Sequence, residues 1–264
     1  MCALFTAGRN STNLKRIVIM DSKPQKTRRR LLHAKWLATG FIACVLGVGL
    51  LCNQGVAFST EKAVVVPPPT GEEQAPAGEH SATAVLAGGC FWGVQGVFQH
   101  VRGVTNVVSG YTGGSRATAQ YERVSEGDTG HAESVQITYD PTQVSYGRLL
   151  QIFFSVVHDP TELNRQGPDT GTQYRSAVFP LNDAQRKIAT DYVGQLDRAK
   201  VFGRALATRV EPYKGFYPAE TYHQNFLTLH PDHPYIVVND LPKVDNLKRL
   251  FPALYRAQPV LVKG

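Results

Sequence analysis

The stretch Gly88-Gly89-Cys90-Phe91-Trp92-Gly93 joins a predicted strand to a predicted helix. Residues 84–87 form a short apolar run before it, and apolar side chains recur at helical spacing after it, at Val94, Val97, Phe98 and Val101. A helix start stabilises a thiolate through its free amide N–H groups and its dipole, which lowers the thiol pKa from about 8.5. The sequence therefore predicts a reactive thiol at Cys90, the alternative being a small buried core residue.

The first 57 residues have the composition of a leader. Residues 1–35 are polar and basic, and residues 36–52 are apolar and uncharged. This order is typical of an export signal. The apolar run is slightly shorter than the roughly 20 residues that span a bilayer, so a cleaved signal peptide and a retained N-terminal membrane anchor both remain open. We expect an exported protein, periplasmic or anchored to the outer face of the cytoplasmic membrane.

Three further regions follow the leader. Residues 58–80 are rich in Pro and Gly and are expected to form a disordered or semi-extended linker. Residues 81–252 have the length and apolar content of one domain, and residues 253–264 form a C-terminal tail.

The basic charge belongs to the leader. The first 57 residues contain nine of the 28 Lys and Arg residues but only one of the 21 Asp and Glu residues. The remainder carries 19 basic and 20 acidic residues, so it offers no electrostatic case for binding nucleic acid. Cys2, Cys44 and Cys52 also lie in the leader, which leaves Cys90 without a partner for a disulfide within the domain.

Strand and helix patterns alternate within residues 81–252. Strands are expected at residues 105–109, 135–139, 173–179 and 205–210, with a turn at residues 110–114. Ser145 and Asn182 can each cap a helix, the second running to about residue 199, and a short helix is expected at residues 219–229. This mixture predicts an α+β domain with a mixed, mainly antiparallel sheet.

Five motifs in one order carry a family resemblance. They are Gly-Cys-Phe-Trp-Gly at 89–93, Gly-Tyr-Thr-Gly-Gly at 110–114, Gly-Asp-Thr-Gly-His-Ala-Glu at 127–133, His-Asp-Pro at 158–160 and Gly-Thr-Gln-Tyr-Arg-Ser at 171–176. Together they resemble peptide methionine sulfoxide reductase A. The resemblance implies a compact two-layer α/β plait (ferredoxin-like) with an extended C-terminal coil. It also implies reduction of the S epimer of methionine sulfoxide, in proteins and as the free amino acid, for protein repair after oxidation.

The resemblance assigns a role to each motif residue. Cys90 resembles the catalytic nucleophile, which becomes a sulfenic acid when methionine leaves. Tyr121, Glu133 and Tyr174 resemble the groups that hold the sulfoxide oxygen. The substrate-binding residues it implies are Phe91 and Trp92, as a wall for the S-methyl group, and Asp169, near the substrate's main chain.

Turnover departs from the commonest family pattern, because residues 239–264 contain no cysteine that could attack the sulfenic acid. We therefore expect a single-cysteine form that needs an external thiol reductant such as thioredoxin, glutaredoxin or a periplasmic dithiol protein. No metal and no other cofactor is implied. The expected partners are oxidised proteins or peptides and the reductant, with the chain itself a monomer.

Two other functions fit the residues less well. A cysteine hydrolase or acyltransferase would use Cys90 with His131, His158 or His223 as its base. A membrane-tethered binding module would recognise methionine without turnover. A zinc deaminase is excluded, because the His131-Ala132-Glu133 half of its signature lacks the Pro-Cys-x-x-Cys half.

Overall fold

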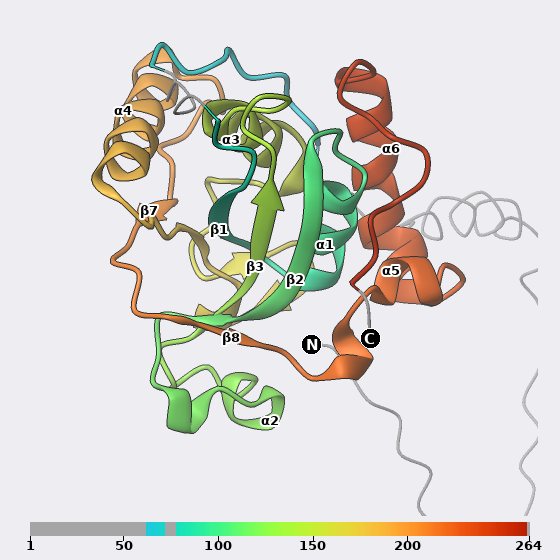
Figure 1. Cartoon of the computed structure of the whole chain (residues 1–264). Coiled ribbons are helices and arrows are strands. Elements are labelled where there is room, and N and C mark those ends of the chain that lie inside the picture. The colour runs from blue at the N-terminus through green and yellow to red at the C-terminus, as the bar shows by residue number, and fades with distance from the viewer. Residues whose placement is uncertain (1–61, 72–77, 263–264) are drawn as a thin grey trace, which may run out of the picture. The chain divides into compact units, whose positions relative to one another are not determined.

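The computed structural model describes residues 62–71 and 78–262, so the expected leader lies outside the described residues. Its centre is a six-stranded sheet in the order β7-β6-β1-β3-β2-β8 (Figure 1). The strands span β1 (Ala82–Gly88), β2 (Val104–Thr112), β3 (Ala132–Tyr139), β6 (Ser176–Val178), β7 (Arg209–Val210) and β8 (Phe216–Pro218). A separate two-stranded hairpin pairs β4 (Arg165–Gln166) with β5 (Asp169–Thr170).

The helices surround this sheet. They are α1 (Phe91–Gln99), α2 (Tyr121–Val124), α3 (Tyr146–Ile152), α4 (Asp183–Ala199), α5 (Phe226–Leu229) and α6 (Leu241–Leu250). Shorter turns of 3₁₀ helix are η1 (Arg116–Thr118), η3 (Thr172–Tyr174) and η4 (Thr221–His223), and π-helical turns are η2 (Phe153–Val157) and η5 (Ile236–Asp240). Within the described ranges, no helix has the length and apolar character needed to cross a membrane.

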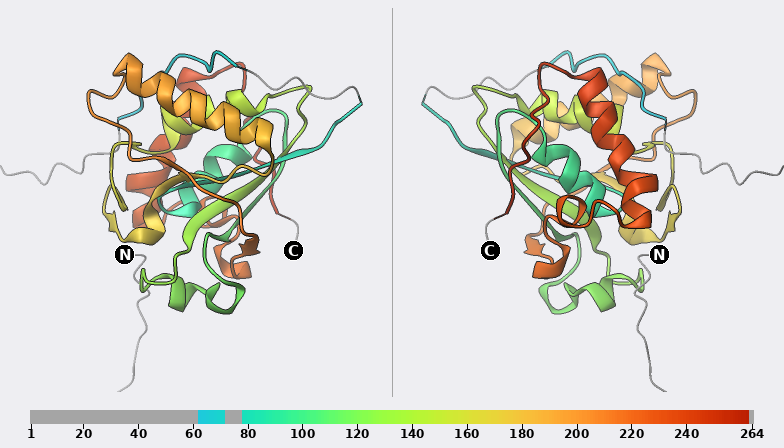
Figure 2. Two further views of the ribbon diagram at one scale, coloured as in Figure 1. Left: turned by 90° about the vertical axis from the view of Figure 1, so that its left-hand side faces the viewer. Right: turned by 90° about the vertical axis from the view of Figure 1, so that its right-hand side faces the viewer.

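The strand pairing confirms the predicted mixed, mainly antiparallel sheet. Strand β1 pairs antiparallel with β3 and β6, and β2 pairs antiparallel with β3 and β8, whereas β6 and β7 are parallel. Helix α1 packs on β2 and β3, and α5 and α6 pack in turn on α1 (Figure 2). The other face is covered around an apolar cluster of Val85, Ala87, Ala132, Ala177 and Phe179. Both faces of the central strands are therefore buried.

The predicted helix caps are confirmed. The side chain of Ser145 accepts a hydrogen bond from the Arg148 amide at 3.2 Å, and that of Asn182 accepts one from the Gln185 amide at 2.7 Å. Each satisfies an amide that the first turn of a helix leaves unpaired.

Several predicted elements are shorter or differ in type. Residues 110–112 continue β2 instead of turning, and Gly110 is required because a Cβ there would overlap Phe216 and the Tyr217 carbonyl on β8. The strands expected at 173–179 and 205–210 shrink to β6 and β7. The helix expected at 219–229 is divided into η4 and α5 by Asn225, whose φ is 58°.

The domain ends in helical structure, because residues 236–250 form η5 and α6. Pro242 lies in the first turn of α6, where its missing N–H costs nothing, and Val244 and Leu247 bury one face of the helix. Extended chain follows only afterwards. There the Arg102 amide donates to the Leu254 carbonyl at 2.7 Å, and the Val260 amide donates to the Gln99 carbonyl at 3.0 Å.

Residues 62–71, ten of the 23 residues of the expected linker, are extended and bound to the domain. The Val64 amide donates to the Ser155 carbonyl at 3.0 Å, and the Gln151 side chain donates to the Val66 carbonyl at 2.8 Å. The Tyr192 hydroxyl donates to the Pro67 carbonyl at 2.6 Å, and Val66 is only 1% exposed. This segment, which we call the strap (residues 62–71), is therefore part of the folded domain and not a disordered spacer.

Candidate active site

Cys90 is the N-cap residue of α1, as the sequence predicts, and its side chain is buried. The chain reaches it from β1 through Gly89, whose φ of 89° favours glycine. A Cβ at Gly89 would also lie 2.7 Å from Cβ of Gln166, so the β4–β5 hairpin closes directly over this turn. The thiol is thus held at the positive end of a nine-residue helix, where a thiolate is favoured.

Glu133 faces the same helix start from β3. Its carboxylate Oε2 accepts a hydrogen bond from the Phe91 amide, the first amide of α1, at 3.0 Å. Burial raises the pKa of Glu133 to about 8, opposed by the Phe91 hydrogen bond and reinforced by the nearby carboxylates of Asp169 and Asp240. Glu133 therefore holds its proton at neutral pH, as a general acid must.

Asp169 lies in β5 and is 1% exposed. Its carboxylate accepts a hydrogen bond from the hydroxyl of Tyr235, the residue just before η5. Burial, together with the nearby Cys90, Asp240 and Asp169, raises the pKa of Tyr235, so that this phenol stays a proton donor. The structure thus brings Asp169, Tyr235 and Cys90 into one cluster.

An aromatic wall flanks the thiol. Trp92 stacks on Phe226 of α5 with ring centroids 3.7 Å apart and an interplanar angle of 7°. Its indole Nε1 donates to Nδ1 of His223 at 3.1 Å, and the His223 ring in turn lies 5.0 Å from that of Phe91. Both predicted apolar residues, Phe91 and Trp92, are buried, which gives an apolar surface beside Cys90.

Tyr121 and Tyr174 are also buried, at 7% and 2% exposure. The Tyr121 ring lies 4.5 Å from the His223 ring, which links it to the aromatic wall, and its amide donates to Glu220 at 3.0 Å. Tyr174 ends η3, which packs on β3, the strand of Glu133. Both tyrosines are therefore fixed within the elements that surround the site.

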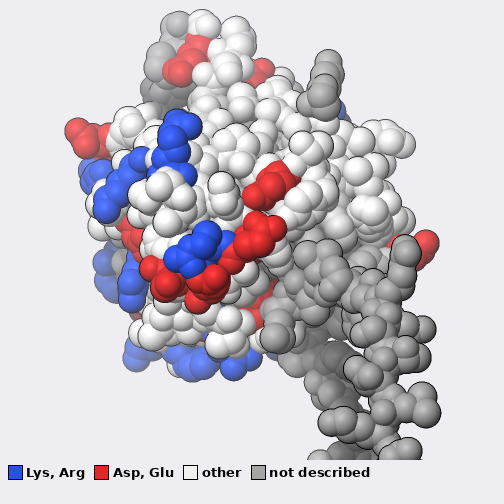
Figure 3. Space-filling model, turned by 90° about the horizontal axis from the view of Figure 1, so that it is seen from below, with Lys and Arg blue, Asp and Glu red and all other residues white. Residues whose placement is uncertain are grey.

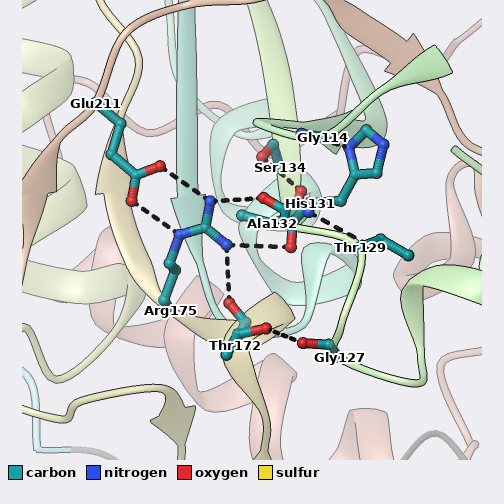
Figure 4. Close-up of polar contacts among 10 residues, drawn as sticks. Gly114, Gly127, Thr129, His131, Ala132, Ser134, Thr172, Arg175 and Glu211 are labelled. Atoms are coloured by element: carbon teal, nitrogen blue, oxygen red, sulfur yellow. Dashed lines mark hydrogen bonds and ion pairs between the residues drawn. The ribbon is translucent and has the colours of Figure 1, made fainter. Parts of the chain in front are cut away.

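Arg175 ties together the two polar loops that carry these residues (Figure 4). Its guanidinium donates to both carboxylate oxygens of Glu211, at 2.9 and 3.0 Å. It also donates to the carbonyls of Gly130, His131 and Thr172, at 3.1, 3.1 and 3.0 Å. A bidentate charged pair of this kind resists rotation, so the loop before Glu133 and the turn before Arg175 keep one relative position.

The three candidate histidine bases have other partners. His158 is bonded through Nδ1 to the Phe153 carbonyl at 3.2 Å and through Nε2 to the Ser176 hydroxyl at 2.6 Å. His131 is bonded to the Ser115 carbonyl and the Gly114 amide. His223 accepts from Trp92, and its Nε2 has no hydrogen-bond partner among the described residues. Within the part of the chain that the structure describes, the hydrogen bonds of these three rings therefore go to groups other than the thiol that a hydrolase would need them to activate.

Sequence reasoning missed the contribution of the chain after residue 219. Glu220, Phe226, Tyr235 and Asp240 all reach the site or the residues next to it, and His223, which the sequence offered only as a base for a hydrolase, bonds to Trp92 instead. The available signal was the density of aromatic and titratable residues between 217 and 240, in a segment with weak periodicity. Their distance along the chain from Cys90 concealed the contact.

The face of the molecule on which α2 lies carries charges of both signs (Figure 3). Basic and acidic side chains alternate on one side of this view, beside a wide uncharged area. Arg123, for example, pairs with Asp128 at 3.2 Å. The described residues seen in this view therefore form no continuous basic surface.

Comparison with known proteins agrees with this geometry. The family model for peptide methionine sulfoxide reductase matches residues 82–253. Peptide methionine sulfoxide reductase MsrA 2 of Mesorhizobium japonicum is 64% identical over 191 residues, covering 72% of this chain and 96% of its own. MsrA 2 of Synechocystis is 54% identical over 175 residues, covering 66% of this chain and 82% of its own.

A solved structure shares the fold. Reduced Mxr1 from Saccharomyces cerevisiae is 34% identical, with a TM-score of 0.55, and the match covers 64% of this chain and 96% of that one. With the sequence matches above and a buried cysteine at a helix start beside a buried glutamic acid, the chain belongs to the peptide methionine sulfoxide reductase family.

Proposed function

We propose that this chain reduces the S epimer of methionine sulfoxide to methionine, in oxidised proteins and peptides and as the free amino acid. The observation that carries the proposal is that Cys90 and Glu133 both lie at the start of helix α1. The thiol lies at the N-terminus of α1, and a carboxyl that is protonated at neutral pH is bonded to the first amide of that helix. A nucleophile and a general acid can thus act on the same sulfoxide group of the substrate.

The chemistry follows from these two groups. The Cys90 thiolate attacks the sulfoxide sulfur while Glu133 protonates the sulfoxide oxygen, which makes that oxygen able to leave. This attack forms a bond between the two sulfurs, and the protonated oxygen leaves the substrate sulfur as hydroxide or water. Hydroxide or water then attacks the Cys90 sulfur and the sulfur–sulfur bond breaks, which releases methionine reduced by two electrons and leaves Cys90 as a sulfenic acid. Cys90 is oxidised by the same two electrons, so the half-reaction balances.

The surrounding side chains fit the roles that the resemblance implies. Tyr121 and Tyr174 would hold the sulfoxide oxygen as hydroxyl donors, and Phe91 and Trp92 would receive the S-methyl group. Asp169 would act near the substrate's main chain, although its bond from Tyr235 places it close to the thiol as well. The buried aromatic wall supports the placement of the methyl group.

Turnover would require an outside thiol. Cys90 is the one cysteine among residues 62–71 and 78–262, so no second thiol of the described domain can attack its sulfenic acid. A first thiol would form a mixed disulfide with release of water, and a second would restore Cys90. Thioredoxin, glutaredoxin or a periplasmic dithiol protein has this chemistry.

Two wider proposals rest on the sequence and the topology. The basic and apolar pattern of residues 1–57 supports export to the periplasm or anchoring to the outer face of the cytoplasmic membrane. The strand order β6-β1-β3-β2, with α1 and α3 in the two crossovers, supports a ferredoxin-like α/β plait for the core.

The test compares S- and R-epimer methionine sulfoxide peptides in the presence of dithiothreitol. Wild type is expected to reduce the S epimer only, and Cys90→Ser is expected to be inactive. The matched control replaces Cys2, Cys44 and Cys52 with serine, which should leave turnover unchanged. Absence of S-epimer reduction by wild type would refute the function, and loss of turnover in the control would refute the external-thiol step.

A further inference from the structure

A buried ion pair lies against helix α1, at the point where η5 continues into α6. Lys243 Nζ lies 3.4 Å from Asp240 Oδ1, and the side chains are 9% and 0% exposed. Removing two charges from water costs more than a pair at this distance usually returns. We therefore look for a function of the Asp240–Lys243 pair other than stabilising the fold.

The position of the pair is set by Gly93. A Cβ on Gly93 would overlap the Asp240 carboxylate, so the glycine of the Gly-Cys-Phe-Trp-Gly motif makes room for it. Gly93 is three residues after Cys90 and thus lies on the same side of α1. The turn η5 and helix α6, which supply Asp240 and Lys243, both pack on α1.

The pair belongs to the charge environment of the catalytic groups. Burial is the main cause of the raised pKa of Glu133 and of Tyr235, and Asp240 adds to it in both cases, together with Asp169 at Glu133 and with Cys90 at Tyr235. Lys243 helps lower the pKa of the buried His158 behind Gly88. The titratable groups around Cys90 and Glu133 in the described residues include Tyr111, Asp169, Tyr235 and Asp240, with Lys243 and His158 next to them.

These neighbours pose a conflict that the ion pair can resolve. Glu133 must keep its proton, which a nearby negative charge favours, whereas Cys90 must lose its proton, which the same charge opposes. An anion with a cation directly beside it serves both needs, because the anion favours the protonated form of Glu133 and the cation weakens the repulsion of the Cys90 thiolate.

We propose that Asp240 and Lys243 are positioning residues for the reduction step: Asp240 holds the proton on Glu133, and Lys243 limits the repulsion that Asp240 exerts on the Cys90 thiolate. The proposal rests on the function proposed above. It gives residues 239–264, which contain no cysteine that could attack the sulfenic acid, a function in the reduction step.

The first test is the pH profile of a single turnover without reductant, followed as methionine formed per Cys90. The rate falls as pH rises through the pKa of Glu133, because only the protonated acid is active. Asp240→Asn removes the anion and leaves Lys243, so this alkaline limb should move about one pH unit lower. Lys243→Met should move it higher, and the double variant should return it toward wild type.

The second test does not depend on reductase activity. The rate of Cys90 alkylation by iodoacetamide measures its thiolate as pH rises. Asp240→Asn should move the onset of alkylation to lower pH, and Lys243→Met should move it to higher pH. If wild type forms no methionine but these shifts occur, the proposed function fails and the charge coupling stands.

The matched control is the exposed pair Lys187–Asp191 on α4, whose charged atoms are 2.6 Å apart. Asp191→Asn and Lys187→Met make the same charge changes and should move neither profile. A shift of both site variants in one direction, or failure of either to move in its stated direction, overturns the proposal. Where Asp240→Asn does not fold, the neutral double variant and Lys243→Met decide the matter by the same criteria.

Discussion

The indole Nε1 of Trp92 donates a hydrogen bond to Nδ1 of His223 at 3.1 Å, and this bond fixes the tautomer of the histidine. Because Nδ1 accepts, the neutral ring carries its proton on Nε2. Burial lowers the pKa of His223 to about 4, against the pull of Glu220 and Glu122, so the ring stays neutral over the working range. The substrate wall is therefore held by a neutral acceptor.

Loss of that acceptor should be measurable. We expect His223→Leu to lower the free energy of unfolding by about 1–3 kcal/mol, because the buried Trp92 N–H loses its partner. It should also raise KM for a sulfoxide peptide more than it lowers kcat. Trp92→Phe removes the donor instead, so His223→Leu should cost less in that background. Urea denaturation of wild type, the two single variants and the double variant gives the coupling free energy between Trp92 and His223. If the two substitutions change the free energy of unfolding additively, the hydrogen bond does not contribute to stability.

Glu133→Gln should abolish the proton donation while keeping the shape of the side chain. We expect the single-turnover rate of methionine formation to fall by a factor on the order of 10²–10⁴. The decline of the wild-type rate above about pH 8, where Glu133 loses its proton, should disappear from the residual activity. Stopped-flow quenching across pH 6 to about 10 checks both outcomes. Persistence of the decline in Glu133→Gln would assign it to another group.

Two helical glycines provide a matched pair of substitutions. Gly194 in α4 has only the flexible end of Arg198 near its missing Cβ, so Gly194→Ala should stabilise the protein by up to about 1 kcal/mol. Gly93→Ala should destabilise it, because the new methyl group meets the Asp240 carboxylate. Chemical denaturation of both variants measures the difference. A stabilised Gly93→Ala would mean that Asp240 moves aside without cost.

The strap also contains its own control. Val66 is 1% exposed and Val65 is 58% exposed. We expect Val66→Ala to lower the free energy of unfolding by about 1–2 kcal/mol, because the substitution removes the two buried γ-methyl groups of the valine. Val65→Ala should change it by less than about 0.5 kcal/mol. Equal effects of the two substitutions would show that the strap does not hold in solution.

The sequence predicted those parts of the molecule that local chemistry decides. The junction at Cys90, the caps Ser145 and Asn182 and the sheet character follow from short-range patterns. The turn predicted at Gly110 was wrong, because the sequence alone does not distinguish a glycine that permits the close approach of β8 from a glycine in a turn. Tyr235, Asp240 and Lys243 could not be placed, since their role depends on packing against a helix about 150 residues earlier in the chain.

The strap changes the reach of whatever precedes it. A free linker of residues 58–80 would let the domain travel some 75 Å from an anchor at residue 57, at about 3.3 Å per extended residue. With Val64 bonded to Ser155, only six residues separate residue 57 from the domain, a span of about 20 Å. On the proposed anchoring to a membrane, the strap would therefore shorten the reach of the enzyme toward its oxidised protein substrates.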